Sequence, residues 1–167
     1  LTPGKDRVYL ETFPMTKIAT QASLRFAQQV ACKELDIDCS NNDFLFGIDS
    51  MPGIVGGPSA GSSAAFLASA LLLNRSVPKD LAMTGTINSG GIIGPVGGLK
   101  YKIEAAAKKG MKRVYIPRGT REVKEKNTTI DLIPYGESFN VSVREVATIA
   151  EVWAIEFGIT DLDNSSL

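Results

Sequence analysis

The sequence predicts a single compact α+β domain, with a mixed β-sheet and packed helices. A chain of 167 residues is long enough to enclose one sizeable hydrophobic core. Segments with strand-like and helix-like apolar spacing alternate irregularly along it. The turn residues 88–91 separate two short apolar runs, which indicates at least one β-hairpin. We expect the domain to occupy residues 1–160, with residues 161–167 as a flexible tail.

The first half of the chain contains two predicted strands and two predicted helices. The strands are expected at residues 7–11 and 44–48, the second after a turn at 41–43. Thr16 is expected to cap a helix that ends near residue 35. The second helix is expected at residues 59–73, ahead of Asn74. The apolar side of the first helix is expected to contain Ile18, Ala22, Leu24, Phe26, Val30 and Ala31.

The second half is predicted to continue with short strands and two helices. A strand at 81–87 is followed by the hairpin turn and a returning strand that begins at 92–93. A helix at 100–109 should end at Gly110, where glycine permits a left-handed cap. The remaining expected elements are strands at 114–116, 130–133 and 140–143 and a helix at 145–156, with Pro117 stopping the first of these strands.

Composition excludes several classes of function. Eighteen basic and eighteen acidic residues balance, so no electrostatic footprint for nucleic acid or an anionic membrane is expected. The longest apolar run, residues 64–73, is too short to span a bilayer, and no signal-peptide pattern opens the chain. Cys32 and Cys39 lack partners for metal binding and are interpreted as ordinary residues of a reducing compartment. We therefore expect a cytoplasmic location and no metal site.

The stretch Gly56–Ala65, GGPSAGSSAA, is the most informative part of the sequence. Its small residues lead into an apolar helix, which places Ser59 where a turn enters that helix, beside the unsatisfied N–H groups of the first turn. Such N–H groups can stabilise an oxyanion next to a nucleophile. The chain contains no histidine, so a catalytic Ser59 would need a lysine or a carboxylate as its base.

Four motifs in the same order resemble the proteolytic domain of the Lon protease family. They are GPSAG at 57–61, AMTG at 82–85, GPVGGLKYKIEAAAKKG at 94–110 and VYIP at 114–117. The resemblance implies that Ser59 attacks the peptide carbonyl and that Lys102, the second lysine of the GGLKxK motif, is its base. It also implies that Thr84 hydrogen-bonds the lysine amine. It implies the α+β fold that Lon proteolytic domains share with the GHMP kinases.

The chemistry of a Ser-Lys pair needs an unusual lysine. A free lysine has a pKa of about 10.4, so it must be desolvated to act as a base near neutrality. The apolar neighbours of Lys102 on its helix can provide that environment. We expect the backbone N–H groups of Ala60 and Gly57 to form the oxyanion hole, and Gly56 and Pro58 to belong to the substrate loop. Many Lon enzymes have an acidic residue at the position of Gly56, so the loop 50–56 is the least transferable part of the comparison.

The resemblance also implies a wider setting. Lon proteolytic domains cleave unfolded polypeptides, assemble as rings that are usually hexameric, and follow an ATPase module. This chain has no G-x-x-x-x-G-K-[ST] phosphate loop, so ATP and Mg²⁺ are expected only in an associated module and no cofactor is expected here. The first hairpin of the family's domain is expected to be missing.

Two alternatives remain open on the sequence. The run Pro58–Ala65 also resembles the glycine-serine phosphate loop of GHMP small-molecule kinases, because a helix N-terminus with small residues can bind phosphate. That interpretation gives no role to GGLKYK. The other alternative is a catalytically inactive Lon-like assembly domain. Bound nucleotide would favour the kinase, and an inert chain that forms rings would favour the assembly domain.

Overall fold

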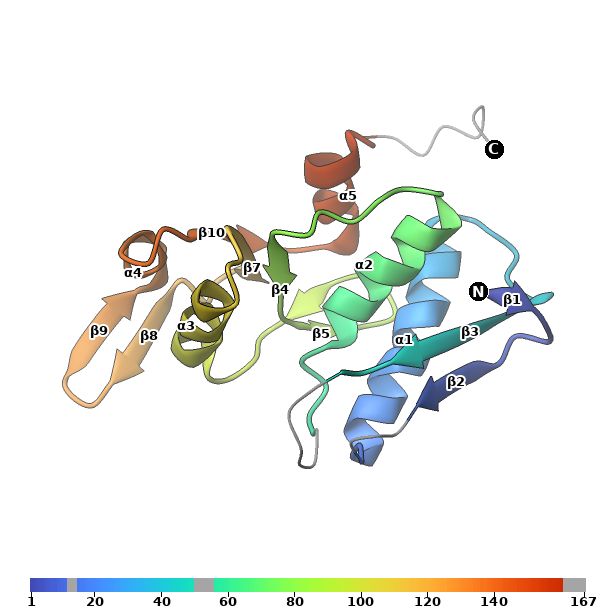
Figure 1. Ribbon diagram of the computed structural model, residues 1–167, viewed down its shortest axis with the longest axis horizontal. Helices are drawn as coiled ribbons and strands as arrows, with labels where there is room; N and C mark the ends of the chain where they lie inside the picture. Colours follow the sequence, from blue (N-terminus) through green and yellow to red (C-terminus); the bar gives the residue numbers. More distant parts are fainter. Residues whose placement is uncertain (12–14, 50–55, 161–167) are drawn as a thin grey trace.

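A parallel three-stranded sheet lies in the middle of the molecule (Figure 1). The computed structural model describes residues 1–11, 15–49 and 56–160. The strand order is β10-β7-β4, so β4 is an edge strand. Alternate residues of β7 point to opposite faces, which puts Tyr115 in one hydrophobic cluster and Val114 and Ile116 in another. The strands are β4 (Leu81–Met83), β7 (Arg113–Pro117) and β10 (Ser142–Val146).

Helices cover both faces of this sheet. The core on the Tyr115 face includes side chains of α1, α2 and α5, while the core on the other face includes those of α3 and α4. In Figure 1, β4 lies between α3 and α2. The helices α2 and α3 therefore lie on opposite faces of the sheet, one on each side of its edge strand. The helices are α1 (Ile18–Glu34), α2 (Gly61–Leu72), α3 (Leu99–Lys108), α4 (Leu132–Glu137) and α5 (Ile149–Phe157).

A second sheet and two hairpins complete the fold. In the second sheet, β3 pairs in parallel with β2 and antiparallel with the short β1. The hairpin β5–β6 follows β4, and the hairpin β8–β9 extends beyond α3 and α4 (Figure 1). These strands are β1 (Thr2–Pro3), β2 (Val8–Glu11), β3 (Asn42–Gly47), β5 (Thr86–Ile87), β6 (Ile93–Gly94), β8 (Glu122–Glu125) and β9 (Thr128–Asp131).

The α+β class and most of the predicted elements are confirmed. The hairpin around residues 88–91 is present, with Thr86 opposite Gly94 and Ile87 opposite Ile93. Gly110 has φ +78°, the left-handed conformation expected after α3. The expected tail 161–167 and most of the loop 50–56 lie outside the described residues.

Three predicted strands and helices differ from the structure. The strand expected at 81–87 is two strands, β4 and β5, because the chain leaves one sheet at Thr84 and enters another. Residues 132–133 begin α4 rather than extend a strand, since the Asp131 carboxylate caps that helix by accepting the Ile133 N–H. Residues 144–146 belong to β10, and α5 begins only after Thr148, whose hydroxyl accepts the Glu151 N–H. β7 ends at Pro117, as predicted, although Pro117 itself still pairs with Val146.

The N-terminal region also corrects the prediction. Residues 41–43 were expected as a turn, but β3 already begins at Asn42, where it pairs with the unforeseen β1. The strand β8 was not predicted either, because its residues are mostly charged.

The first helix, α1, begins and faces differently from the prediction. Lys17 is its N-cap residue, without a side-chain cap, so the prediction that Thr16 caps it is wrong. Ile18 is 83% exposed and Phe26 48% exposed, so they do not belong to the buried face. That face instead includes several polar side chains at helical spacing: Thr20, Ser23 and Gln28.

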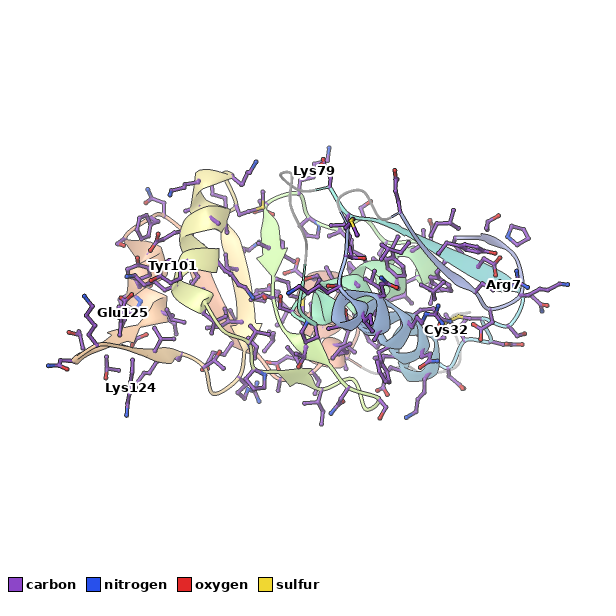
Figure 2. The ribbon with its side chains drawn as sticks, turned by 90° about the horizontal axis from the view of Figure 1, so that it is seen from below. Arg7, Cys32, Lys79, Tyr101, Lys124 and Glu125 are labelled. Atoms are coloured by element: carbon purple, nitrogen blue, oxygen red, sulfur yellow. A yellow bond between two sulfur atoms is a disulfide. The ribbon has the colours of Figure 1, made fainter. Side chains whose placement is uncertain are left out.

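Cys32 and Cys39 form a disulfide, which contradicts their interpretation as ordinary residues of a reducing compartment. The bond joins Cys32, in the C-terminal turn of α1 (Figure 2), to the segment that enters β3. Both cysteines are buried in one cluster with Phe44 and Ala68. Sequence spacing alone does not reveal such a pairing, because it depends on the path of the chain between the two residues. Disulfides persist in oxidising environments, so cysteine usage no longer supports a reducing compartment.

Reduction of this disulfide is expected to lower the free energy of unfolding by about 2 kcal/mol, because the bond restricts only a short loop of the unfolded chain. Urea unfolding with and without dithiothreitol measures the difference. The double variant Cys32→Ala/Cys39→Ala is the control and should be insensitive to the reductant. Equal stability of the oxidised and reduced protein would contradict the prediction.

Candidate active site

Ser59 lies immediately before α2, in a turn closed by the hydrogen bond from Gly61 N–H to Pro58 O at 3.1 Å. Gly57 has φ +91°, a conformation that favours glycine, and it lets the chain turn into the helix. The hydroxyl of Ser59 therefore lies near the positive end of the α2 dipole. The N–H groups of Ser59 and Ala60 donate to no other described residue. We call residues 57–61 the serine turn.

The serine turn is hydrogen-bonded to residues 84 and 85, which join β4 to β5. Gly85 N–H donates to Ser59 O at 3.0 Å, and Ser62 N–H donates to Gly85 O at 3.1 Å. Thr84 Oγ1 donates to Ser59 O at 3.3 Å. A Cβ atom at Gly85 would lie 2.4 Å from a methyl group of Ile93, so only glycine fits between α2 and β6. These contacts place Ser59 next to Thr84.

Lys102 reaches the same place from α3, on the other side of the edge strand. Its Nζ donates to Thr84 Oγ1 at 3.0 Å. Ile103 and Ala106 are buried against the sheet and fix the face that α3 presents. Burial lowers the pKa of the Lys102 ammonium, because desolvation disfavours the charged form. Thr84 thus contacts both residues, while Ser59 and Lys102 make no direct hydrogen bond to each other.

Lys100, the first lysine of the GGLKxK motif, has a different environment. Its Nζ forms an ion pair with Glu125 at 2.6 Å, and Tyr101 donates its hydroxyl to the same carboxylate at 3.1 Å. Figure 2 shows Tyr101 and Glu125 together, at the hairpin β8–β9. The hydrogen bond to Glu125 raises the pKa of Lys100. This lysine is held as an ammonium, away from Ser59.

A cavity of about 440 Å³ opens beside these groups. Ser59, Thr84 and Lys102 line it together with mostly apolar side chains. A cavity of this size and lining can hold a side chain of an extended peptide. The remaining residues around it are Ala60, Ser63, Ala82, Met83, Ala105, Ala106, Lys109, Met111 and Val114.

Of the other predicted site residues, Ala60 lines this cavity, whereas Gly56, Gly57 and Pro58 do not. Pro58 contributes the carbonyl that closes the turn. Gly56 packs against the side chain of Lys17, and the Gly57 carbonyl accepts a hydrogen bond from Thr20 at 3.0 Å. This contact of Thr20 was not predicted from the sequence. The only signal for it was a polar residue on the buried face of α1, which does not identify a partner elsewhere in the chain.

Metal-binding and membrane-spanning features are absent from the part of the chain that the structure describes. No three histidine, cysteine, aspartate or glutamate side chains there lie close enough together to bind a metal ion. None of the described helices has the length and apolar character needed to cross a bilayer.

Known proteins are similar to this chain in the region that contains the motifs of the candidate site. The model of the Lon protease (S16) C-terminal proteolytic domain matches residues 47–157. The Lon protease of Paraburkholderia phytofirmans is 39% identical over 121 residues, which cover 70% of this chain and 15% of that protein. Lon protease 2 of Borreliella burgdorferi is 35% identical over 97 residues, 58% of this chain and 11% of the relative.

The Lon protease of Syntrophus aciditrophicus is 46% identical over 66 residues, 40% of this chain and 8% of the relative. The chain therefore spans at most 15% of the length of these three proteins. The family match extends from the end of β3 to the end of α5 and includes Ser59, Thr84 and Lys102. Because this match covers more than half of its residues, the chain belongs to the family of Lon protease C-terminal proteolytic domains.

Proposed function

We propose that this chain is a Lon-type endopeptidase domain in which Ser59 is the nucleophile and Lys102 is the general base. The observation that carries the proposal is the hydrogen bond between Lys102 and Thr84 in the wall of the cavity that also contains Ser59. It supports a role for Thr84 in aiming the amine at the serine. The lowered pKa of Lys102 supports its role as a base, since only the neutral amine can accept a proton.

The proposed reaction begins when Ser59 Oγ attacks the peptide carbonyl carbon and Lys102 takes the hydroxyl proton. Backbone N–H groups of the serine turn, that of Ala60 first among them, stabilise the oxyanion. The C–N bond then breaks, and the Lys102 ammonium gives its proton to the leaving amine. Water next attacks the acyl ester, Lys102 accepts a proton from it, and the acid leaves as Ser59 regains its proton.

The wider setting belongs to the proposal as well. The substrates would be unfolded polypeptides, with one apolar side chain in the 440 Å³ cavity. We further propose a homo-oligomeric ring, hexameric by analogy with the family, and an associated ATPase module that binds ATP and Mg²⁺. The Cys32–Cys39 disulfide removes the basis on which a cytoplasmic location was expected, so no location is proposed. No cofactor acts in the peptide hydrolysis proposed here.

Ser59→Ala is expected to abolish cleavage of a quenched, unstructured fluorescent polypeptide, because it removes the only proposed nucleophile. Ser69→Ala is the matched control. Ser69 lies on the same helix, and its buried hydroxyl donates to Ala65 O far from the cavity. Loss of this hydrogen bond should lower the free energy of unfolding by about 1 kcal/mol at most, which leaves the domain folded. The activity of this variant should therefore stay within about fivefold of the wild type.

Other outcomes would support other functions. Cleavage that survives Ser59→Ala would contradict the proposal. An inert wild-type chain that still forms rings would favour the assembly domain. Binding of a nucleotide to the serine turn would favour the kinase.

A further inference from the structure

The first turn of α1 lies against the serine turn, although the two segments are distant in sequence. Thr20 Oγ1 donates to Gly57 O at 3.0 Å, and the Thr20 side chain is 1% exposed. Next to it, the side chain of Lys17 packs under Gly56, so closely that a Cβ atom there would lie 2.8 Å from Lys17 Cδ. The helix therefore contacts two successive residues just ahead of Ser59.

The Thr20 hydroxyl is directed at Gly57 rather than at its own helix. A threonine in a helix can donate to the carbonyl three or four residues earlier. Here, the Lys17 carbonyl already accepts the N–H groups of Thr20 and Gln21, at 3.0 and 3.3 Å. On the other side, the buried Ser23 hydroxyl donates to Thr20 O at 2.8 Å. Because the Lys17 carbonyl is already occupied, the Thr20 hydroxyl is available to donate to the distant Gly57 carbonyl.

The acceptor of this bond is the only polar group of its peptide unit. Residue 58 is proline, which has no N–H, so the Gly57–Pro58 peptide can be held by hydrogen bonding only through the Gly57 carbonyl. The downstream end of the serine turn is held separately, by Gly85 at the Ser59 carbonyl and at Ser62 N–H. Thr20 supplies the corresponding restraint at the upstream end, where Gly57 has φ +91°.

We propose that Thr20 is a positioning residue that fixes the serine turn from its upstream side and so aims Ser59 and the Ala60 N–H at the substrate carbonyl. This inference rests on the proposed function for its effect on catalysis. Its effect on the backbone of the turn does not depend on any activity. The two can therefore be tested separately.

The kinetic test compares Thr20→Val, which keeps the shape and removes the hydroxyl, with Thr20→Ser, which keeps the hydroxyl. On a quenched peptide substrate, Thr20→Val is expected to lower kcat about tenfold with little change in KM, because alignment of the nucleophile affects the chemical step. Thr20→Ser should restore kcat to within about threefold of the wild type. The pH at which activity is half-maximal should not move, because Lys102 and its surroundings are untouched.

The second test measures amide hydrogen exchange by NMR in the same variants. The N–H groups of Gly61 and Gly85 are hydrogen-bonded only while the serine turn is in place. Thr20→Val should speed their exchange about tenfold relative to the wild type, with Thr20→Ser close to the wild type. The N–H of Thr84, which donates to Tyr115 O in the central sheet, is the control and should not change.

The outcomes separate the two ideas. If the wild-type chain cleaves nothing but Thr20→Val loosens Gly61 and Gly85 alone, the proposed function fails and the positioning role stands. If Thr20→Val leaves both kcat and exchange unchanged, the positioning role is wrong while Ser59 can still be the nucleophile. A uniform rise in exchange that includes Thr84 would show that Thr20 merely stabilises the fold and would overturn the inference.

Discussion

Replacing Lys102 by methionine is expected to lower kcat/KM for peptide cleavage by about 10³-fold or more, because a general base contributes about 10²–10⁴ and no histidine can substitute for it. Lys100→Met is the matched control on the same helix. Its ammonium is paired with Glu125, so its loss should change the activity less than about fivefold. The measurement is steady-state cleavage of a quenched peptide by both variants. The reverse order of effects would assign the base to Lys100.

The pH dependence of the wild type tests the same assignment. Burial lowers the pKa of Lys102, so the neutral amine becomes available at a lower pH than for a free lysine. Activity should therefore rise with pH through this lowered pKa and reach a plateau above it. A profile that falls as the pH rises from 6 to 9 would contradict a lysine base.

Stability provides an independent check on the Lys102→Met variant. Between the lowered pKa of the folded chain and the ordinary lysine pKa of the unfolded chain, the unfolded chain holds the Lys102 proton more readily, so stability rises with pH across this window and the cost of the ammonium is fully present below it. Methionine removes the partly buried ammonium and leaves a side chain of similar length. We therefore expect Lys102→Met to be at least as stable as the wild type at pH 7. Loss of activity in a stable variant would exclude misfolding as its cause.

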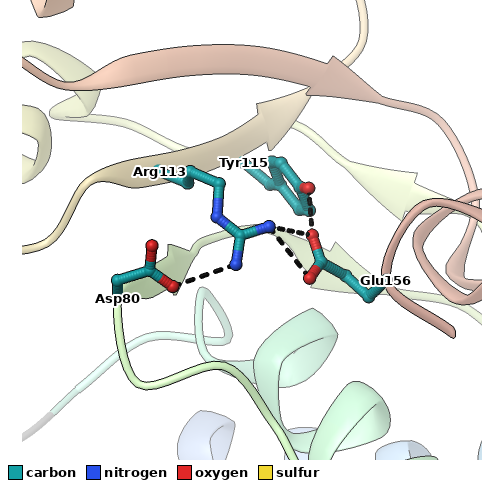
Figure 3. A network of polar contacts seen from close by, with 4 residues as sticks. All are labelled: Asp80, Arg113, Tyr115 and Glu156. Carbon is teal, nitrogen blue, oxygen red and sulfur yellow. Dashed lines mark hydrogen bonds and ion pairs between the residues drawn. The ribbon is translucent and has the colours of Figure 1, made fainter.

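Replacing Glu156 by alanine is expected to lower the free energy of unfolding by about 3 kcal/mol. The carboxylate of Glu156, on α5, is 3% exposed and accepts hydrogen bonds from Arg113 at 2.7 and 3.0 Å and from the Tyr115 hydroxyl (Figure 3). Breaking a buried ion pair costs about 3–5 kcal/mol, and the partly exposed Arg113 side chain places this pair at the lower end. Urea unfolding at neutral pH, with the m-value compared, measures the loss.

The control for Glu156 is Asp80, the second carboxylate on Arg113. Asp80 bonds the same guanidinium at 2.9 Å, but its side chain is 46% exposed. Asp80→Ala should therefore destabilise the protein much less than Glu156→Ala. Equal losses in the two variants would mean that burial of Glu156 is not the reason for its effect.

Tyr115 in the same network makes the fold sensitive to alkali. Burial and the hydrogen bond to Glu156 raise the pKa of Tyr115 from 10.0 to about 12. The folded chain therefore holds this proton more tightly than the unfolded chain does. The associated stability is fully present below pH 10 and is lost as the pH rises toward 12.

Local signals in the sequence located most elements because those signals act within a few residues. Gly110 ends α3 as predicted, since the left-handed conformation it adopts is a property of one residue type. The break at Thr84 was not predictable in this way. Residues 81–87 have strand character on both sides of Gly85, and the neighbours β7 and β6 decide that they belong to two sheets.

In the candidate site too, local sequence signals identified some residues, whereas contacts between distant segments were not predictable. Ser59 was identified by the small residues that precede a helix, and Lys102 by its motif together with the absence of histidine. The contact of Thr20 with Gly57 joins positions that are far apart in the chain, so no local pattern reveals it. Cys32 and Cys39 were misread for a related reason, because their pairing depends on how the chain returns from α1 to β3.

The two hydrophobic cores on the two faces of the central sheet determine how much of the chain must be synthesised before the candidate site can assemble. The core beneath the Ser59 helix includes Tyr115, Val146 and Trp153, and Lys102 is held by the other core, which includes Val143. Both cores thus draw on the last third of the chain. A nascent chain that has emerged only as far as Ser59, or even Lys102, lacks the residues that hold the two together. Under the proposed function, a nascent chain would therefore gain peptidase activity only after its last third has emerged and packed into both cores.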